Sequence, residues 1–414
     1  MGKSLNRRRR PRSPTFLSVG VHGAAGLGFA GASLVLARVL PELEYATVTL
    51  AIALVNFGHP LSTVGIDGVV LRRDLDRGPR LLARVLAATS AVALALALIG
   101  EVGYGLSPSF SAMVFLSIAR GGAMYVAASR IQREQRYVLS LTLMQSPNLV
   151  LILAAVMTVV TRSTSAGLPV LVSTVGFVVA AGWGWAVLFA ERGPLLVPEP
   201  AFPWREALAF MGLNASGLLL VQLDRLIIPY LLPLEELATY GVLAAIVGSL
   251  FRVLQMGVAY SLIPRLTAAA SVRARRRLLV AEARLVILVI GVGSVGIWLV
   301  TPLVEHVLLA DKYHLTNALI LSAIAAGVAK SLNAFSNATV TALADPRELR
   351  LVNVLGWVSV VVSSGAAVLG ARWGLAGVVY GVGLGWLLRA LAGLALTMRH
   401  LRPAPAKAAD QSTA

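Results

Sequence analysis

Five basic side chains lie deep inside long apolar stretches of this sequence, where a charge is expensive. They are Arg120, Arg225, Arg252, Lys330 and Arg389. A charged side chain at the centre of a bilayer costs about 2.5–3.5 kcal/mol on insertion scales, and it usually faces a protein interior or a water-filled cavity. Only Asp224 offers an acidic partner at similar depth, with Asp67 nearer the end of its stretch. The surplus of deep cations predicts a cationic cavity that accepts an anionic substrate.

Amides and hydroxyls repeat at helical spacing beside these charges. The segment KSLNAFSNATVT places Lys330, Asn333 and Asn337 on one face of a predicted helix, and Arg252 shares a face with Gln255 in another. Such amides can hydrogen-bond a sugar or another polar headgroup, although the same groups also join helices to one another. We therefore expect a substrate-binding cavity lined by Arg120, Arg252, Lys330, Arg389, Asn333, Asn337 and Gln255.

Asp224 and Arg225 are adjacent in the apolar run LLLVQLDRLIIPYLLP. Consecutive residues on a helix do not face each other, so these two are not expected to form a neighbour bridge. We expect one to face the cavity and the other to face an adjacent helix or the seam between two lobes. A role in ion coupling or at this seam is predicted for Asp224, Arg225 and Asp67. The alternative is an interhelical ion pair that fixes the packing.

The whole composition indicates a membrane protein. The chain has 414 residues, of which 57% are hydrophobic and 13% charged, and its mean hydropathy is +0.80. Soluble domains carry about 25% charged residues, and a helix needs roughly 20 mostly apolar residues to cross a bilayer. This sequence offers such stretches repeatedly, which predicts an all-α integral membrane protein. The absence of cysteine excludes disulfides and thiolate chemistry.

The apolar stretches predict twelve transmembrane helices in two six-helix lobes around a central cavity. The expected spans are about 15–40, 44–66, 82–106, 110–130, 137–160, 167–190, 206–232, 236–262, 282–303, 315–343, 350–370 and 373–398. Four closely spaced prolines at 194, 198, 200 and 203 cannot continue a helix. We therefore predict a first lobe at 1–193, a cytoplasmic linker at 194–205, a second lobe at 206–400 and a disordered cytoplasmic tail at 401–414.

Basic residues predict the orientation, because cytoplasmic loops carry an excess of lysine and arginine. If the N-terminus is cytoplasmic, the segments on the outer side contain only Arg38, Arg162, Lys312 and Arg372. Both termini are then cytoplasmic, in the inner (cytoplasmic) membrane of the cell. The net charge of +17 is explained by topology and by contact with membrane lipids, and we expect no nucleic-acid partner.

Signatures of enzyme chemistry are weak in this sequence. GVGSVG at 291–296 matches a dinucleotide fingerprint, but that motif needs a strand before it and a soluble fold around it. Small residues inside a predicted span are instead typical of close helix packing. The five histidines lack the spacing of metal ligands. We predict a transporter with no catalytic residue, no metal and no cofactor.

Three segments together resemble the polysaccharide flippases of the multidrug/oligosaccharidyl-lipid/polysaccharide exporter superfamily. LDRLIIPYLLPLEELATYGVLAAI at 223–246 resembles their seventh-to-eighth helix hairpin, with Asp224, Arg225, the acidic pair 235–236 and Tyr240 in the matching places. ARVLPELEYATVTLAIALVNF at 37–57 resembles their first hairpin, although Ala46 stands where a glycine is common. GLAGVVYGVGLGWLLRALAGL at 374–394 resembles their last helix.

This resemblance implies a flippase for cell-surface polysaccharide synthesis. Its substrate would be an oligosaccharide linked to polyprenyl diphosphate, moved from the inner to the outer leaflet by alternating access. Membrane lipids and other polysaccharide-assembly proteins are the expected partners. A multidrug or cation antiporter of the same superfamily is the main alternative, with Asp67 and Asp224 as its acids. A lipid-II flippase, which typically has two more helices, and a membrane glycan polymerase, which needs a large outer loop, are less favoured.

Overall fold

The computed structural model describes residues 14–73, 75, 78–190, 202–269 and 271–400, and all of its regular elements there are helices. The long helices are α1 (Pro14–Val39), α2 (Glu42–Ser62), α4 (Pro79–Leu98), α5 (Pro108–Arg133), α6 (Tyr137–Thr161), α7 (Gly167–Ala190), α8 (Trp204–Leu231), α9 (Leu234–Ala268), α10 (Val272–Leu303), α11 (Asn317–Leu343), α12 (Pro346–Gly370) and α13 (Gly374–His400). The short elements are α3 (Ile66–Arg72), η1 (Ile99–Gly103), η2 (Val304–Leu308) and η3 (Ala371–Trp373).

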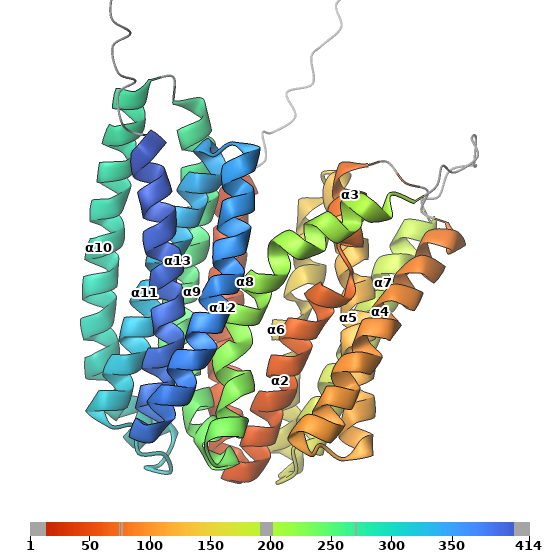
Figure 1. The fold of residues 1–414 in the computed structure, drawn as a ribbon. Coiled ribbons are helices and arrows are strands. Elements are labelled where there is room, and N and C mark those ends of the chain that lie inside the picture. The colour runs from red at the N-terminus through yellow and green to blue at the C-terminus, as the bar shows by residue number, and fades with distance from the viewer. Residues whose placement is uncertain (1–13, 74, 76–77, 191–201, 270, 401–414) are drawn as a thin grey trace, which may run out of the picture.

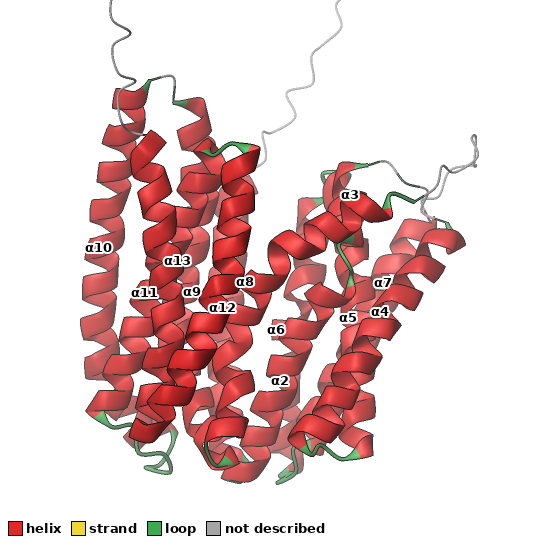
Figure 2. Cartoon of the chain, viewed as in Figure 1, coloured by secondary structure: helices red, strands yellow, loops and turns green. Residues whose placement is uncertain are grey.

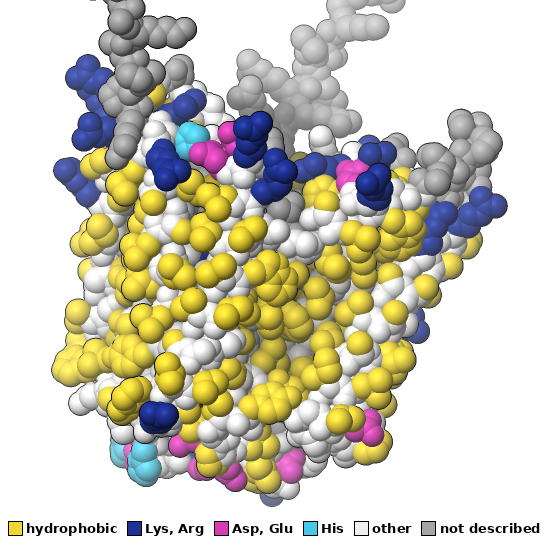
Figure 3. All heavy atoms as spheres, in the orientation of Figure 1, with side chains coloured by type: hydrophobic (Ala, Val, Ile, Leu, Met, Phe, Trp, Pro, Cys, Tyr) yellow, Lys and Arg dark blue, Asp and Glu magenta, His cyan; other side chains and the backbone are white. Residues whose placement is uncertain are grey.

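The predicted membrane architecture is confirmed. Every long helix has at least 20 residues, which is roughly the length that crosses a bilayer. By a strict test of length and hydropathy, eight helices within the described residues could span a membrane, or nine if the bent pair α2–α3 is one span. Figure 3 shows a broad hydrophobic band across the face in view, between two charged ends. An all-α membrane protein with around twelve helices is therefore the fold of this chain.

The long helices form two lobes that α1 and α8 join. Helices α2 and α4–α7 pack with one another in the first lobe, and α9–α13 do so in the second (Figure 1). Helix α1 packs against both α6 and α9, and α8 contacts α2 and α3 as well as α12 and α13. The lobe limits 1–193 and 206–400 remain predictions. Most of the predicted linker, 194–201, and the tail at 401–414 lie outside the described residues.

The second predicted span is broken in the structure. A single helix was expected over 44–66, but α2 ends at Ser62 and α3 follows after a bend of 48°. Gly65 in this break has φ +76°, and a Cβ there would overlap the carbonyl oxygen of Ala207 in α8. Only glycine tolerates both the left-handed backbone and this approach. The break thus lets the start of α8 lie directly against the first lobe.

The loops gather at two opposite ends of the molecule, and these ends differ in charge (Figures 2 and 3). We call one end the basic face. It carries the arginines of α3, of the start of α4 and of the start of α10, including Arg72, Arg80 and Arg273. The other end is the acidic face, with the turns at 40–42, 104–107, 232–235 and 309–316 and with Glu42, Glu235 and Glu305.

Candidate functional site

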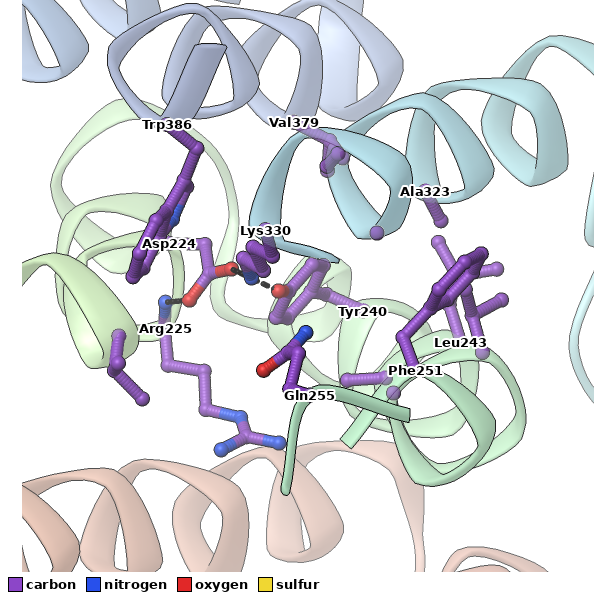
Figure 4. Close-up of a pocket in the computed structure, with 16 residues that line it drawn as sticks. Asp224, Arg225, Tyr240, Leu243, Phe251, Gln255, Ala323, Lys330, Val379 and Trp386 are labelled. Carbon is purple, nitrogen blue, oxygen red and sulfur yellow. Dashed lines mark hydrogen bonds and ion pairs between the residues drawn. The ribbon is translucent and has the colours of Figure 1, made fainter. Parts of the chain in front are cut away.

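Asp224, in the middle of α8, accepts hydrogen bonds from two other helices. The Nζ of Lys330 on α11 lies 3.1 Å from Oδ2, and the hydroxyl of Tyr240 on α9 donates to the same oxygen (Figure 4). The backbone N–H of Arg225 donates to Oδ1 at 3.0 Å. Asp224 is only 4% exposed. Its carboxylate is therefore fully partnered and ties α8, α9 and α11 together.

Arg225 points away from its neighbour. Its Nη1 donates to Oε1 of Gln222 at 3.1 Å, and Figure 4 shows the guanidinium extending toward the N-terminal helices, drawn in pale red. The two charges thus face different helices, in agreement with the sequence-based expectation for consecutive helical residues. The ion-coupling role predicted for Asp224 and Arg225 stays a prediction.

These groups line a small cavity of about 110 Å³, which we call the charged pocket. Asp224, Tyr240 and Lys330 line it, and Gln255 of α9 reaches it as the sequence predicted. Trp386 of α13 completes one wall, with the Nζ of Lys330 lying 5.9 Å from the centroid of its ring. Asp224 and Lys330 are paired in this pocket, whereas Arg225 bonds only the neutral Gln222 and its Nε has no acceptor among the described residues.

A larger cavity of about 350 Å³ lies beside it toward the basic face, and we call it the vestibule. Both lobes line it, through the break between α2 and α3, the first half of α8 and the later turns of α11 and α13. Val221 and Trp386 line both cavities and so form their common wall. Asp67 also lines the vestibule, and its Oδ1 accepts a hydrogen bond of 2.7 Å from the Thr63 hydroxyl.

Arg389, on α13, brings an unpaired guanidinium to the vestibule. It forms no ion pair or hydrogen bond with any other described residue, and its Nε is buried without an acceptor. The side chain lies close to glycines of two helices: a Cβ on Gly217 would be 3.4 Å from its Nη1, and one on Gly356 would be 3.7 Å from its Cζ. A guanidinium presents five donors in a fork that fits phosphate oxygens. Arg389 is therefore well suited to bind an anion.

Two of the predicted amides also reach the vestibule. Asn333 is only 8% exposed, and its side chain has no hydrogen-bond partner among the described residues. Asn337 lies one turn further along α11 and is exposed. Buried polar groups normally have partners, so the free Asn333 amide indicates a place for water or a ligand. Asn214 of α8 lines the same cavity and was not predicted.

The structure corrects the unpaired state expected for Lys330 and leaves the cavity role of Arg120 a prediction. Lys330 was grouped with the unpaired deep cations, but its ammonium is bonded to Asp224, which lies 106 positions earlier in the chain. Arg120 lines neither the charged pocket nor the vestibule. It is partly exposed and follows Ser109, Ala112 and Leu116 on the exposed side of α5. The side chain of Arg252 lies outside the described residues, so its predicted place stays a prediction.

The sequence did not single out Trp386 as a site residue. Its ring is 6% exposed, and its Nε1–H has no acceptor in the described part of the chain. The available signal was its spacing of three positions from Arg389, which places both on one face of α13. A single tryptophan in an apolar helix is ordinarily a core residue, so this signal alone did not predict a function.

The opposite end of the molecule is closed by polar contacts between the lobes. Lys312, before α11, donates from Nζ to the carbonyl oxygens of Ala37 and Leu40 at the end of α1. The Tyr313 hydroxyl donates to the Ala37 oxygen at 3.1 Å, and Arg38 donates to the Val307 oxygen at 3.2 Å. We call this set the acidic-face clamp. It joins the segment before α11 to α1, the helix that packs against α6 of the first lobe and α9 of the second.

The turn before Lys312 has an unusual backbone conformation. Ala310 and Asp311 have φ values of 51° and 56°, a left-handed region that non-glycine residues rarely adopt. Burial lowers the pKa of Lys312 below its ordinary value, and the Glu42 carboxylate acts in the opposite direction.

A second contact lies at the same face. The Tyr104 hydroxyl donates to the Leu226 oxygen at 2.8 Å, and the centroid of the Tyr104 ring lies 4.7 Å from that of Tyr230.

Comparison with known proteins shows the fold alone. No family model and no curated protein matches this sequence. Among solved structures, an inward-facing multidrug resistance MATE family transporter of the MOP superfamily aligns at 14% identity over 94% of this chain and 98% of its own, with TM-score 0.66. The lipid II flippase MurJ in an inward closed conformation aligns at 11% identity over 93% and 87%, with TM-score 0.62. A mutant of the Vibrio cholerae MATE transporter VcmN aligns at 15% identity over 94% and 96%, with TM-score 0.59.

The chain therefore shares the fold of these structural neighbours, which include transporters of the MOP superfamily, the multidrug/oligosaccharidyl-lipid/polysaccharide exporter superfamily whose flippases the sequence resembles. These neighbours are named as transporters or flippases, and the fold accommodates both kinds. The subtype must be argued from the residues of this chain.

Proposed function

We propose that this protein is a flippase that carries an oligosaccharide linked to polyprenyl diphosphate across the membrane by alternating access. One observation supports it most: a vestibule between the lobes contains an unpaired guanidinium, Arg389, beside the free amide of Asn333. A diphosphate offers the anionic oxygens that a guanidinium binds in a forked geometry. The sugars offer hydroxyls that an amide can bond.

The charge balance of the two cavities favours an anionic substrate. Their described cations are Arg225, Lys330 and Arg389, and their described acids are Asp224 and Asp67. The first of these acids is neutralised by Lys330 inside the protein. What remains is Arg389 in the vestibule and Arg225, whose guanidinium bonds only the neutral Gln222, against the single Asp67 carboxylate. A diphosphate would compensate the positive charge that the protein leaves unpaired.

The direction of transport follows from the distribution of charge. The basic face would lie in the cytoplasm under the positive-inside rule, in the inner membrane of the cell, with both termini on that side. The vestibule would then accept the substrate from the cytoplasmic leaflet, while the polyprenyl chain stays in the lipid. Rocking of the lobes would close the vestibule and open the acidic face. Membrane lipids and polysaccharide-assembly proteins are the proposed partners, and nucleic acid is not.

A multidrug cation antiporter would need a free acid in its cavity. Asp224 has three hydrogen-bond partners, including an internal ammonium, and Asp67 is held by Thr63 in the vestibule. Binding a cation to Asp224 would require Lys330 to leave. A lipid-II flippase would use the same anion chemistry, and only the helix count separates it from our proposal.

The proposal is tested by a leaflet-resolved assay in proteoliposomes. The probe is a fluorescent disaccharide on a polyprenyl diphosphate, placed in the outer leaflet of the vesicles. A membrane-impermeant reagent reduces the fluorophore only in that leaflet, so the fluorescence that is protected reports transport. Arg389→Gln removes charge-assisted hydrogen bonds worth about 1.5–3 kcal/mol, so we expect transport to fall by roughly 10- to 100-fold. Arg372→Gln, in η3 at the acidic face, is the matched control and should transport normally. Unchanged transport by Arg389→Gln would contradict the anion site.

A further inference from the structure

We propose that the vestibule contains a sugar-binding subsite formed by Trp386 and Asn333, one helical turn from the anion-binding Arg389. The first sugar of the carried glycan would stack on the Trp386 ring while Asn333 bonds its hydroxyls. This inference rests on the proposed function and adds to it the recognition of the sugar next to the diphosphate.

The spacing of the residues fits a ligand with two joined parts. Trp386 and Arg389 are three positions apart on α13, so they share a face and lie about 4.5 Å apart along the helix axis. Both line the vestibule. A phosphate held by the guanidinium would place the sugar that it carries beside the aromatic ring. Another side of the same cavity is lined by α11, which supplies Asn333.

Trp386 has the features of an incomplete binding surface. It stands between the charged pocket and the vestibule and lines both. On the pocket side, the Lys330 ammonium lies 5.9 Å from the ring centroid. Its indole N–H has no acceptor among the described residues, although a buried tryptophan N–H usually finds one. A sugar hydroxyl or ring oxygen is an acceptor of the required kind.

Asn333 provides a second and independent observation. It is 8% exposed, lines the vestibule from α11 and lacks a side-chain partner in the described residues. An amide carries two donors and an acceptor, all of which can bond a ligand that enters the cavity. Binding sites combine aromatic walls with a few polar groups that set orientation. An aromatic ring beside an amide that can both donate and accept suits a polyhydroxylated ring.

The nearby charges favour a sugar over a planar aromatic cation, which could also stack on an indole ring. A planar aromatic cation would lie close to the Arg389 guanidinium, which has no counter-ion in the described residues and would repel it. A neutral sugar attached to a phosphate meets no such repulsion. The subsite therefore favours a phosphate-linked sugar.

The test measures binding to the full-length protein in lipid nanodiscs. The sugar-free probe is geranylgeranyl diphosphate, and the glycosylated probes are the same lipid carrying glucose, galactose, N-acetylglucosamine or rhamnose. We expect at least one glycosylated probe to bind more tightly than the sugar-free lipid. Trp386→Leu should reduce that affinity by roughly 10-fold, the loss expected for about 1.4 kcal/mol of sugar contact, and leave the sugar-free probe within about 2-fold.

Further variants separate the sugar subsite from the anion site. Arg389→Gln should weaken both kinds of probe, whereas Asn333→Ala should weaken only the glycosylated ones. Trp386→Phe keeps an aromatic face and should retain most of the sugar preference, which shows that the fold is intact. Trp357→Leu, at an exposed position on α12, is the neutral control and should change neither affinity.

Two results would overturn the subsite. One is a set of glycosylated probes that bind no better than geranylgeranyl diphosphate. The other is a Trp386→Leu variant that weakens all probes equally or none of them. Failure of the proposed function has a different signature, since Arg389→Gln would then leave the affinity for geranylgeranyl diphosphate unchanged.

Discussion

At the acidic face, the polar groups between the lobes are paired with one another, whereas in the vestibule at the opposite end several have no protein partner. Lys312 and Tyr313 donate to the carbonyl oxygens at the end of α1, and Tyr104 donates to α8. In the vestibule, Arg389 and Asn333 have free donors in the described structure. The donors at the acidic face are thus satisfied within the protein, whereas those in the vestibule are free to bind a ligand.

This contrast fits the proposed function, in which the vestibule binds the substrate before the lobes move. A neutral hydrogen bond contributes about 0.5–1.5 kcal/mol, the partly exposed Lys312 ammonium about 1.5–3 kcal/mol, and an exposed charged contact such as that of Arg38 about 0–1 kcal/mol, so the contacts at the acidic face total several kcal/mol. Reversing a 1:99 equilibrium between two conformations needs about 5.5 kcal/mol. Binding of a substrate to the free groups of the vestibule can supply energy on that scale. The contacts at the acidic face therefore hold the lobes together without locking them.

The largest expected effect comes from removing one member of a paired group. Lys330→Met leaves the Asp224 carboxylate buried without its counter-ion, which costs about 3–5 kcal/mol of stability. We expect a sharp fall in the unfolding temperature in detergent, measured by circular dichroism. Adding Asp224→Asn to this variant should restore most of the loss, because a neutral amide can still accept from Tyr240.

Arg389→Gln is the matched change at an unpaired group. No partner within the described protein is lost, so the free energy of unfolding should change by less than about 0.5 kcal/mol while transport falls. If Arg389→Gln lowers the unfolding temperature as much as Lys330→Met does, the distinction between paired and unpaired charges is wrong.

The next effect concerns the acidic-face clamp. Lys312→Met removes both hydrogen bonds of one partly exposed ammonium to the end of α1, which together contribute about 1.5–3 kcal/mol, so the open form of this face should gain roughly 10- to 100-fold in population. The natural chain has no cysteine, so spin labels can be attached through Glu101→Cys and Asn317→Cys alone. Pulsed electron resonance then measures the distance between the lobes at this end.

Arg372→Met is the control for that measurement, because Arg372 lies at the same face but outside the clamp. Its distance distribution should match that of the labelled parent protein. A Lys312→Met variant that keeps the parent distribution would show that the clamp does not hold the lobes.

Most of the fold could be predicted from the sequence, because a membrane helix is a long apolar run and carries its own signal. The break between α2 and α3 could not be, since it depends on the approach of Ala207 to Gly65 and the chain has 38 glycines. A glycine that is required for a tertiary contact has no distinctive local pattern. The division of this span into α2 and α3 is therefore known only from the structure.

The candidate site was predicted in part for a similar reason. Depth along a helix can be counted in the sequence, which is why Arg389 and Asn333 were found. The direction of a side chain depends on neighbours far away in the chain, so the Asp224 partner of Lys330 was missed, and Arg120 lines neither the charged pocket nor the vestibule. Trp386 was missed because its unpaired N–H is a property of the packed structure.

A smaller effect is expected from the second contact at the acidic face. Tyr104→Phe removes one neutral hydrogen bond to the Leu226 oxygen but keeps the ring against Tyr230. The loss of about 0.5–1.5 kcal/mol should raise the open population by roughly 2- to 10-fold in the same distance measurement. An effect as large as that of Lys312→Met would mean that the neutral contact contributes as much as the charged one.

The smallest effect is a dependence on pH that belongs to Lys312. Burial lowers its pKa in the closed form below the ordinary value of 10.5, with Glu42 opposing the shift. As the pH rises through that lowered pKa, the closed form loses its proton before the open form, in which the amine is in water. The closed form should therefore gain population between the lowered pKa and pH 10.5, and show no dependence below that range. Lys312→Arg stays charged throughout and should remove this rise. A closed population that falls with pH, or rises equally in Lys312→Arg, would show that the Lys312 amine is not buried by closure.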